Sequence, residues 1–235
     1  NLLNKIKLIF HILRWRFTWS KRNLDFLPEG TISDKFATAR NMAAMIPDGA
    51  TVFSSGFAGN ARCSVFFWAI RELFLKNGHP RGLTWINVGA QGGRGKVPGT
   101  VEELGLPGLI TRYITGHTET AKAQLHLAEA GQLELHVLPQ GVMAHILEAQ
   151  GRGESFVSSE VGVSTFMDPR TGHGSPVTLP ATFRLVQADG NMLRYTMPAP
   201  DFTLINAPYA DAEGNVYFHH ASSLSENIPA AAAAR

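Results

Sequence analysis

Three loops in this sequence combine glycine with side chains that suit an acyl or carboxylate ligand. Residues 56–59 read Gly-Phe-Ala-Gly between a predicted strand and a predicted helix, where open backbone N–H groups attract carboxylate or phosphate. Residues 89–95 are richer in glycine and carry Gln91 and Arg94, and an arginine there can meet a phosphate. Residues 139–141, Pro-Gln-Gly, place an uncharged amide that both donates and accepts at a third such junction.

Each loop also has a simpler interpretation that the residues alone leave open. The first is more typical of a tight turn, whereas the second is equally typical of a solvated mobile loop and the third of a glutamine that caps a helix. The glycine spacing is not GxGxxG, and the sequence contains neither a GxxxxGK[ST] nor a G-x-S-x-G motif. Dinucleotide, P-loop and hydrolase-elbow sites are therefore not indicated.

Histidine and cysteine usage predicts neither a metal site nor a disulfide. His117, His126, His136 and His145 fall on different predicted elements, without a carboxylate at ligand spacing. Cys63 is the single cysteine, so an internal disulfide is excluded and a small buried side chain is expected. We expect no bound cofactor.

The elements that must position these loops alternate between strand and helix. Apolar runs between turn signals predict strands at residues 50–55, 83–88, 109–114 and 133–138. Helices are predicted at residues 34–45 with Ser33 as the cap, and at 64–76, 119–130 and 142–150. This alternation predicts an α/β fold with an open, doubly wound, largely parallel sheet, and it places the loops at the carboxyl edge of that sheet.

The last third of the chain has a different pattern. Short strands are predicted at residues 183–185, 193–196, 203–205 and 216–219, and a final helix at 225–235. Ala188-Asp189-Gly190-Asn191 is typical of a hairpin turn. We therefore expect short β hairpins added to the main sheet.

The first residues form a basic, apolar segment. Residues 1–24 contain six Lys or Arg and no Asp or Glu, which leaves 15 basic residues against 19 acidic ones in residues 25–235. The body therefore carries no signal for nucleic-acid binding. We divide the chain into a helical arm, residues 1–30, and a domain, residues 31–235. The arm is expected to dock on a partner protein, on the body of this chain or on a membrane surface, or to be related to organellar targeting; basic residues within it argue against a spanning helix.

Several motifs in register resemble family I coenzyme A transferases, closest to the N-terminal, α-type half of the propionate, acetate and acetoacetate type. The matching text is SGFAGNA (residues 55–61), NGHPRGLTWINVGAQGGRG (77–95), Gly116-His117, LPQG (138–141), EVGVSTFMDPRTGHG (160–174) and YADAEGNVYF (209–218). The resemblance covers about residues 33–235. The arm has no counterpart in it.

The resemblance implies a ping-pong exchange of CoA between an acyl-CoA thioester and a carboxylic acid. A glutamate attacks the thioester to give an acyl-glutamyl anhydride and then a glutamyl-CoA thioester, and the acceptor carboxylate finally takes the CoA. In the family that glutamate lies in a second half, so the implied partner is that half or another protein subunit. Carried over by motif, the residues expected to bind substrate are Gly56, Phe57, Gly59, Gln91, Gln140 and Gly141. No catalytic residue is assigned within this chain.

Two departures support an alternative. The family usually has Pro-Glu after the first glycine loop, where this chain has Arg62-Cys63-Ser64, and Thr118 replaces the usual Trp after Gly-His. Two glutamates of this chain, Glu226 and Glu129, are considered as the nucleophile but are assigned to helix ends instead, with Ser225 and Glu226 acting as a cap. The alternative is a catalytically retired homologue that serves as a structural or accessory subunit of a larger, mitochondrial membrane assembly; a bacterial cytoplasmic protein is the other location considered.

Overall fold

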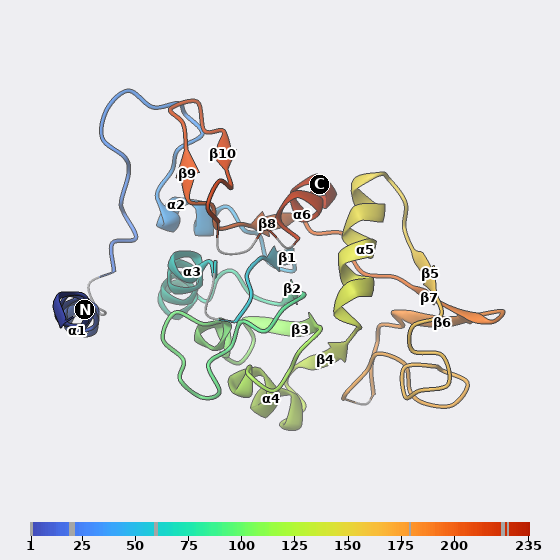
Figure 1. Ribbon diagram of the computed structural model, residues 1–235. Helices are drawn as coiled ribbons and strands as arrows, with labels where there is room; N and C mark the ends of the chain where they lie inside the picture. Colours follow the sequence, from blue (N-terminus) through green and yellow to red (C-terminus); the bar gives the residue numbers. More distant parts are fainter. Residues whose placement is uncertain (1, 19–21, 59–60, 179, 222–223, 225) are drawn as a thin grey trace.

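The computed structural model describes residues 2–18, 22–58, 61–178, 180–221, 224 and 226–235, and within the first range it leaves the side chains of residues 15, 16 and 18 undefined. A central sheet lies between two layers of helices, with a smaller sheet to one side and the first helix standing apart (Figure 1).

The central sheet contains five parallel strands in the order β4-β3-β2-β1-β8. They are β1 (Thr51–Ser54), β2 (Leu83–Asn87), β3 (Ile110–Thr115), β4 (Glu134–Val137) and β8 (Phe202–Leu204). The first four agree with the predicted strands to within two residues at either end. Their parallel pairing confirms the predicted open α/β architecture.

Alternate residues of the strands face two separate cores. On β1, Val52 packs into one and Phe53 into the other, and on β2 the same alternation separates Trp85 from Ile86. Helices α3 (Ser64–Asn77) and α4 (Lys122–Glu129) cover the first face, and α5 (Gln140–Gly151) and α6 (Asn227–Ala233) cover the second (Figure 1). Both faces of the sheet are therefore buried, as its apolar strands require.

Helix α3 starts and ends close to its predicted bounds. Gly78 ends it in the left-handed conformation (φ 67°), and its N–H donates to the Phe74 carbonyl. Cys63 precedes the helix and is buried as expected, and burial raises the pKa of its thiol to about 12.

The predicted helix over residues 34–45 is wrong in its start. Helix α2 spans only Ala39–Ala44, and the Thr38 hydroxyl caps it by accepting from the Asn41 N–H at 3.1 Å. Ser33 instead belongs to a turn, and its own N–H donates to the Ala212 carbonyl at 2.9 Å. This long-range bond competes with the earlier cap and ties the segment to the hairpin of β9 (Tyr209–Ala210) and β10 (Val216–Tyr217).

The smaller sheet contains the β hairpin predicted for the last third of the chain, with different strand bounds. It is antiparallel, in the order β5-β7-β6, with β5 at Val157–Ser159, β6 at Val186–Asp189 and β7 at Met192–Tyr195. The predicted turn at Gly190-Asn191 joins β6 to β7, whereas the strand predicted at residues 183–185 lies three residues further on. The strand predicted near residue 203 is β8, which pairs with β1 in the main sheet rather than in a hairpin.

Helix α1 (Leu2–Thr18) is helical as expected and stands apart from the remaining chain (Figure 1). Its described apolar side chains are exposed. By Leu24, which is 3% exposed, the chain has entered the core. Within the described residues, no helix is both long and apolar enough to cross a bilayer.

Candidate functional site

Three neighbouring strands end in buried polar residues at the same edge of the sheet. Ser54 ends β1, Asn87 ends β2 and Thr115 ends β3, and all three are fully buried. The Trp85 indole N–H donates to the Ser54 hydroxyl at 3.0 Å, and the Asn87 amide donates to the Gly89 carbonyl and to the Thr115 hydroxyl. These bonds give the following loops a fixed start.

The first two loops pack against each other through glycine. Gly56 has φ 126°, and a Cβ there would lie 2.9 Å from the Ala61 carbonyl oxygen. A Cβ on Gly89 would lie 2.8 Å from Cδ2 of Phe57 and 3.1 Å from the Gly56 carbonyl oxygen. Both positions need glycine because the backbones approach too closely for a side chain.

The third loop also packs closely against a glycine. Gln140 is the first residue of α5, and Gly116 lies directly beneath it, since a Cβ on Gly116 would overlap the Gln140 side chain and come within 2.7 Å of the Val88 carbonyl oxygen. The first hydrogen bond within α5 runs from the Met143 N–H to the Pro139 carbonyl. The preceding N–H groups give this helix start a partial positive charge.

These loops enclose a pocket of ≈ 200 Å³. Its walls are Gly56, Phe57, Val88, Gly89, Gln140, Gly141, Ala144 and Glu226. The Phe57 side chain is 52% exposed and so offers an open apolar surface. Among these lining residues Glu226 carries the one ionisable side chain, so the pocket otherwise presents backbone, apolar surface and the Gln140 amide.

The structure brings together four of the six residues predicted to bind substrate. Gly56, Phe57, Gln140 and Gly141 lie on the pocket wall, and Gly59 falls outside the described residues. Gln91 is 1% exposed and lies behind the wall. Its amide donates to the Ser54 carbonyl at 2.7 Å and accepts from the Ser54 hydroxyl at 2.7 Å, so its side chain supports the first loop.

The second loop is held by carboxylates rather than being a free solvated segment. Glu102 accepts from the N–H groups of Gly93, at 2.7 Å, and Gly95, at 3.1 Å. Arg94, considered above for a phosphate, forms an exposed ion pair with Glu119, with 3.0 Å between Nε and Oε1.

Glu226 was assigned to a capping role, and that assignment is wrong for its side chain. It occupies the residue before α6, but its carboxylate makes no capping hydrogen bond, and Ser225 falls outside the described residues. The half-buried side chain lines the pocket instead. Sequence reasoning missed it because Glu226 and Gln140 meet only through the packing of α6 against α5. Glu129, the other carboxylate considered, lies at the exposed end of α4 beside His126.

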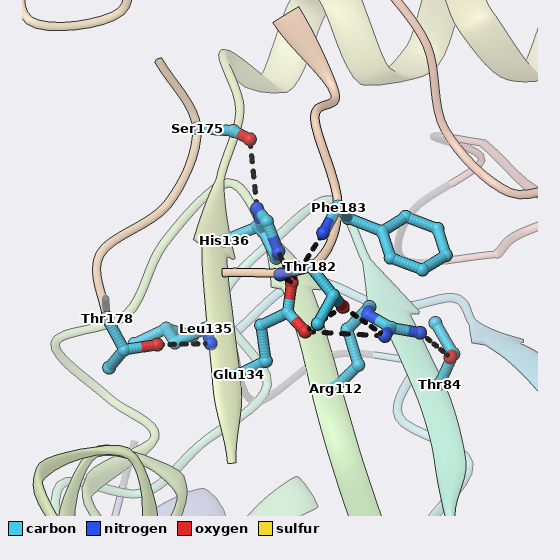
Figure 2. Close-up of polar contacts among 9 residues, drawn as sticks. All are labelled: Thr84, Arg112, Glu134, Leu135, His136, Ser175, Thr178, Thr182 and Phe183. Carbon is cyan, nitrogen blue, oxygen red and sulfur yellow. Dashed lines mark hydrogen bonds and ion pairs between the residues drawn. The ribbon is translucent and has the colours of Figure 1, made fainter. Parts of the chain in front are cut away.

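A second polar cluster lies on β3 and β4 (Figure 2), and none of its residues lines this pocket. Glu134 accepts from the N–H groups of Thr182 and Phe183, both at 2.9 Å, and from the Thr182 hydroxyl. Arg112 pairs with the same carboxylate at 3.3 Å. His136 places Nε2 at 2.8 Å from Glu134 Oε1, and its Nδ1 lies 2.9 Å from the Ser175 hydroxyl.

The charges in this cluster are set by their neighbours. Burial works to raise the pKa of Glu134, but the Thr182 and Phe183 donors, together with His136 and Arg112, outweigh it and lower that pKa to about 2. Burial lowers the pKa of His136 despite the adjacent carboxylate. A neutral His136 therefore donates to Glu134 and accepts from Ser175, and the cluster holds Ser175, Thr182 and Phe183 against the sheet.

A model of the family described as "Coenzyme A transferase" matches residues 36–235. This chain belongs to the coenzyme A transferase family. The match agrees with the resemblance found in the loop motifs. It begins after α1, which lies outside the matched residues.

Among individual relatives, the chain is 31% identical over 204 residues to the caffeate CoA-transferase of Acetobacterium woodii, covering 86% of this chain and 38% of that protein. It is 27% identical over 216 residues to the human protein "Succinyl-CoA:3-ketoacid coenzyme A transferase 2, mitochondrial", covering 85% and 38% respectively. The acyl-CoA transferase YdiF of Escherichia coli O157:H7 has a similar structure, with a TM-score of 0.79 and 25% identity over 88% of this chain and 40% of that chain. For the thioester complex of YdiF with CoA the TM-score is 0.77.

The chain thus spans about two fifths of the length of these relatives. The fold and the family are those of the transferases. The family acts on CoA thioesters, and the pocket between the glycine loops is the candidate functional site of this chain.

Proposed function

We propose that this chain is the α-type domain of a CoA-transferase and provides the acyl and carboxylate pocket for exchange of CoA between an acyl-CoA and a carboxylic acid. The pocket carries this proposal. In a chain of this family, Gly56, Phe57, Gly89 and Gln140 converge from three loops on one nearly neutral cavity. A second half, which is proposed as the partner, supplies the nucleophilic glutamate.

The geometry suits the developing charge of thioester exchange. When a carboxylate attacks the thioester, negative charge grows on the carbonyl oxygen, and fixed neutral donors stabilise it best in a site closed to water. The Gln140 amide and the start of α5 supply such donors at the pocket wall. Glycine at positions 56 and 89 lets the backbone approach the acyl group.

Gln91 and Gly141 have supporting parts in this proposal. Gln91 fixes the first loop from behind through Ser54. Gly141 widens the wall at the start of α5, where a Cβ would meet nothing within 4 Å. Gly59 is proposed as part of the same loop on its sequence alone.

A trapping experiment tests the proposal. The purified chain is incubated with propionyl-CoA, alone and with the C-terminal half of a homologous transferase, and borohydride or hydroxylamine then traps any glutamyl thioester for mass spectrometry. The expected result is no adduct on the chain alone and an adduct on a glutamate of the added half. An adduct on Glu226, lost in Glu226→Gln, would contradict a nucleophile from the second half.

The alternative is a retired enzyme that acts as an accessory subunit. It is supported by Arg62-Cys63-Ser64, which stands in place of the family's Pro-Glu beside the first loop, and by the exposed apolar surface of α1. Stable binding of the second half without any trapped adduct would favour this alternative, provided that the same half forms an adduct with its own α-type domain.

A mitochondrial location is proposed with it. Residues 1–24, which are basic and contain no Asp or Glu, support this location, and a mammalian relative carries "mitochondrial" in its name. The bacterial relatives support cytoplasmic function in a bacterium as the other possibility. Fractionation of cells that produce the full chain distinguishes the two.

A further inference from the structure

Helix α1 presents a large apolar surface that the domain does not cover. Its exposed apolar residues are Leu2, Leu3, Ile6, Leu8, Ile9, Phe10, Ile12, Leu13 and Phe17. Phe10 and Phe17 are 72% and 77% exposed. The helix stands apart from both the sheet and its covering helices (Figure 1). So much apolar surface in one place marks a contact site.

The side chains are ordered around the helix axis. At about 100° per residue, most of the apolar residues fall within an arc of about 120°. Those in this apolar arc are Leu2, Leu3, Ile6, Ile9, Phe10, Leu13 and Phe17. Leu8 and Ile12 lie on the flank beyond Lys5, and Asn4 and His11 lie opposite the arc.

Basic residues border the apolar arc on both sides. Lys5 lies at one margin, and Lys7 and Arg14 lie at the other. Long basic side chains at these margins can lay their methylene groups on apolar surface while their charges remain in water. This is the arrangement of a helix that lies in the plane of a membrane interface, with its apolar face among the lipid chains.

The positive charge of α1 favours binding to a negatively charged surface. The helix contains no acidic residue, whereas residues 25–235 carry 15 basic residues against 19 acidic ones. An anionic lipid surface therefore attracts α1 and repels the body, which orients the chain with its helix toward the membrane. A protein groove would have to match the apolar arc and both basic margins in shape, whereas a lipid surface adapts to them.

We infer that α1 binds the surface of an anionic membrane, lying flat with its apolar arc inserted and Lys5, Lys7 and Arg14 at the headgroups. This inference does not depend on transferase activity. Leu24 already packs into the core of the body, so binding through α1 leaves the body in water.

Vesicle co-sedimentation of the full chain tests this inference. One set of vesicles is pure phosphatidylcholine, and the other replaces about one quarter of it with phosphatidylglycerol. We expect binding to the anionic vesicles at least about tenfold stronger than to the neutral ones, and weakened by added salt because the charge attraction is screened. Equal binding to both sets, or binding to neither, would overturn the inference.

Two variants on adjacent residues separate insertion from simple charge attraction. Phe10→Asp and His11→Asp each add one negative charge to α1, but only Phe10 lies in the apolar arc. We expect Phe10→Asp to reduce binding at least about tenfold, and His11→Asp only a few-fold. Unchanged thermal unfolding of both variants would show that the body is intact. Equal losses, or a Phe10-dependent dimer in light scattering without vesicle binding, would overturn a lipid surface in favour of a protein contact.

Discussion

Two half-buried carboxylates show how differently one fold uses the same group. Glu134 accepts hydrogen bonds from two backbone N–H groups and a hydroxyl, pairs with Arg112 and holds His136. Glu226 makes no capping hydrogen bond and faces a pocket of glycine backbone, Phe57 and Gln140. The first carboxylate stabilises the tertiary structure, whereas the second adds a charge to a cavity that is otherwise neutral.

The residues that stabilise the fold and those expected to bind a ligand therefore lie at different places on the same sheet. The cluster of Glu134, Arg112 and His136 satisfies its charges internally, so its loss should lower the free energy of unfolding. The pocket keeps donors and space for a ligand, so substitutions there should alter binding more than folding. Four experiments test this separation.

The largest effect is expected for Glu134→Ala. Removing the carboxylate leaves the Thr182 and Phe183 N–H groups, and Arg112, without their buried partner, which should cost about 3–5 kcal/mol in the free energy of unfolding. Urea denaturation measures it. Glu129→Ala is the matched control, because Glu129 lies at the exposed end of α4, and a change within about 0.5 kcal/mol is expected there. Similar losses in both variants would remove the distinction.

The stabilisation by Glu134 and His136 should also appear in how the free energy of unfolding depends on pH. The folded pKa of Glu134, about 2, is below its usual value of 4.5, so the stabilisation is present above the usual value and is lost as pH falls toward about 2. The difference corresponds to about 3 kcal/mol. The lowered pKa of His136 acts in the same direction, since the unfolded chain binds that proton more readily below its usual value of 6.5.

Denaturant unfolding between neutral pH and pH 3 measures this slope. In Glu134→Gln, the free energy of unfolding should depend less on pH below the usual carboxylate pKa. In His136→Gln, it should depend less on pH in the range that starts near pH 6.5. An unchanged slope in both variants would contradict the assigned charge states.

Two glycines of the pocket wall give the next comparison. Gly89→Ala forces a methyl group against Phe57 and the Gly56 carbonyl, which should cost about 1–3 kcal/mol and displace the first loop. Gly141→Ala meets nothing within 4 Å and lies in the first turn of α5, so it should stabilise the helix by less than the roughly 0.5–1 kcal/mol gained in a helix interior. Thermal unfolding gives the sign of each. Destabilisation by Gly141→Ala would show that the pocket wall is tighter than the structure indicates.

The smallest change in stability is expected for Glu226→Gln. Its carboxylate makes no capping bond, so unfolding should change by less than about 0.5 kcal/mol. The neutral side chain should nevertheless strengthen binding of propionate severalfold, because a like charge leaves the pocket. Ligand-observed NMR measures this binding. A large loss of stability would restore a structural role for Glu226.

Local patterns in the sequence predicted much of the fold. The four apolar runs of β1 to β4 lie between turn signals. The spacing of apolar residues within each segment indicates whether it is a strand or a helix. Parallel strands then place their carboxyl ends at one edge, which is why Gly56, Phe57 and Gln140 were expected to share a cleft and why they line the same pocket.

Only the tertiary structure decided the remaining features, because each depends on residues far apart in the chain. β8 pairs with β1 across some 150 residues, and Ser33 bonds to Ala212 instead of starting a helix. Gln91 turns behind the pocket because the Ser54 hydroxyl and carbonyl satisfy its buried amide there. Glu226 reaches the pocket through the packing of α6 on α5, a contact that leaves no periodic trace in the sequence. A local pattern reports which face of an element is buried, but not which distant side chain will be buried against it.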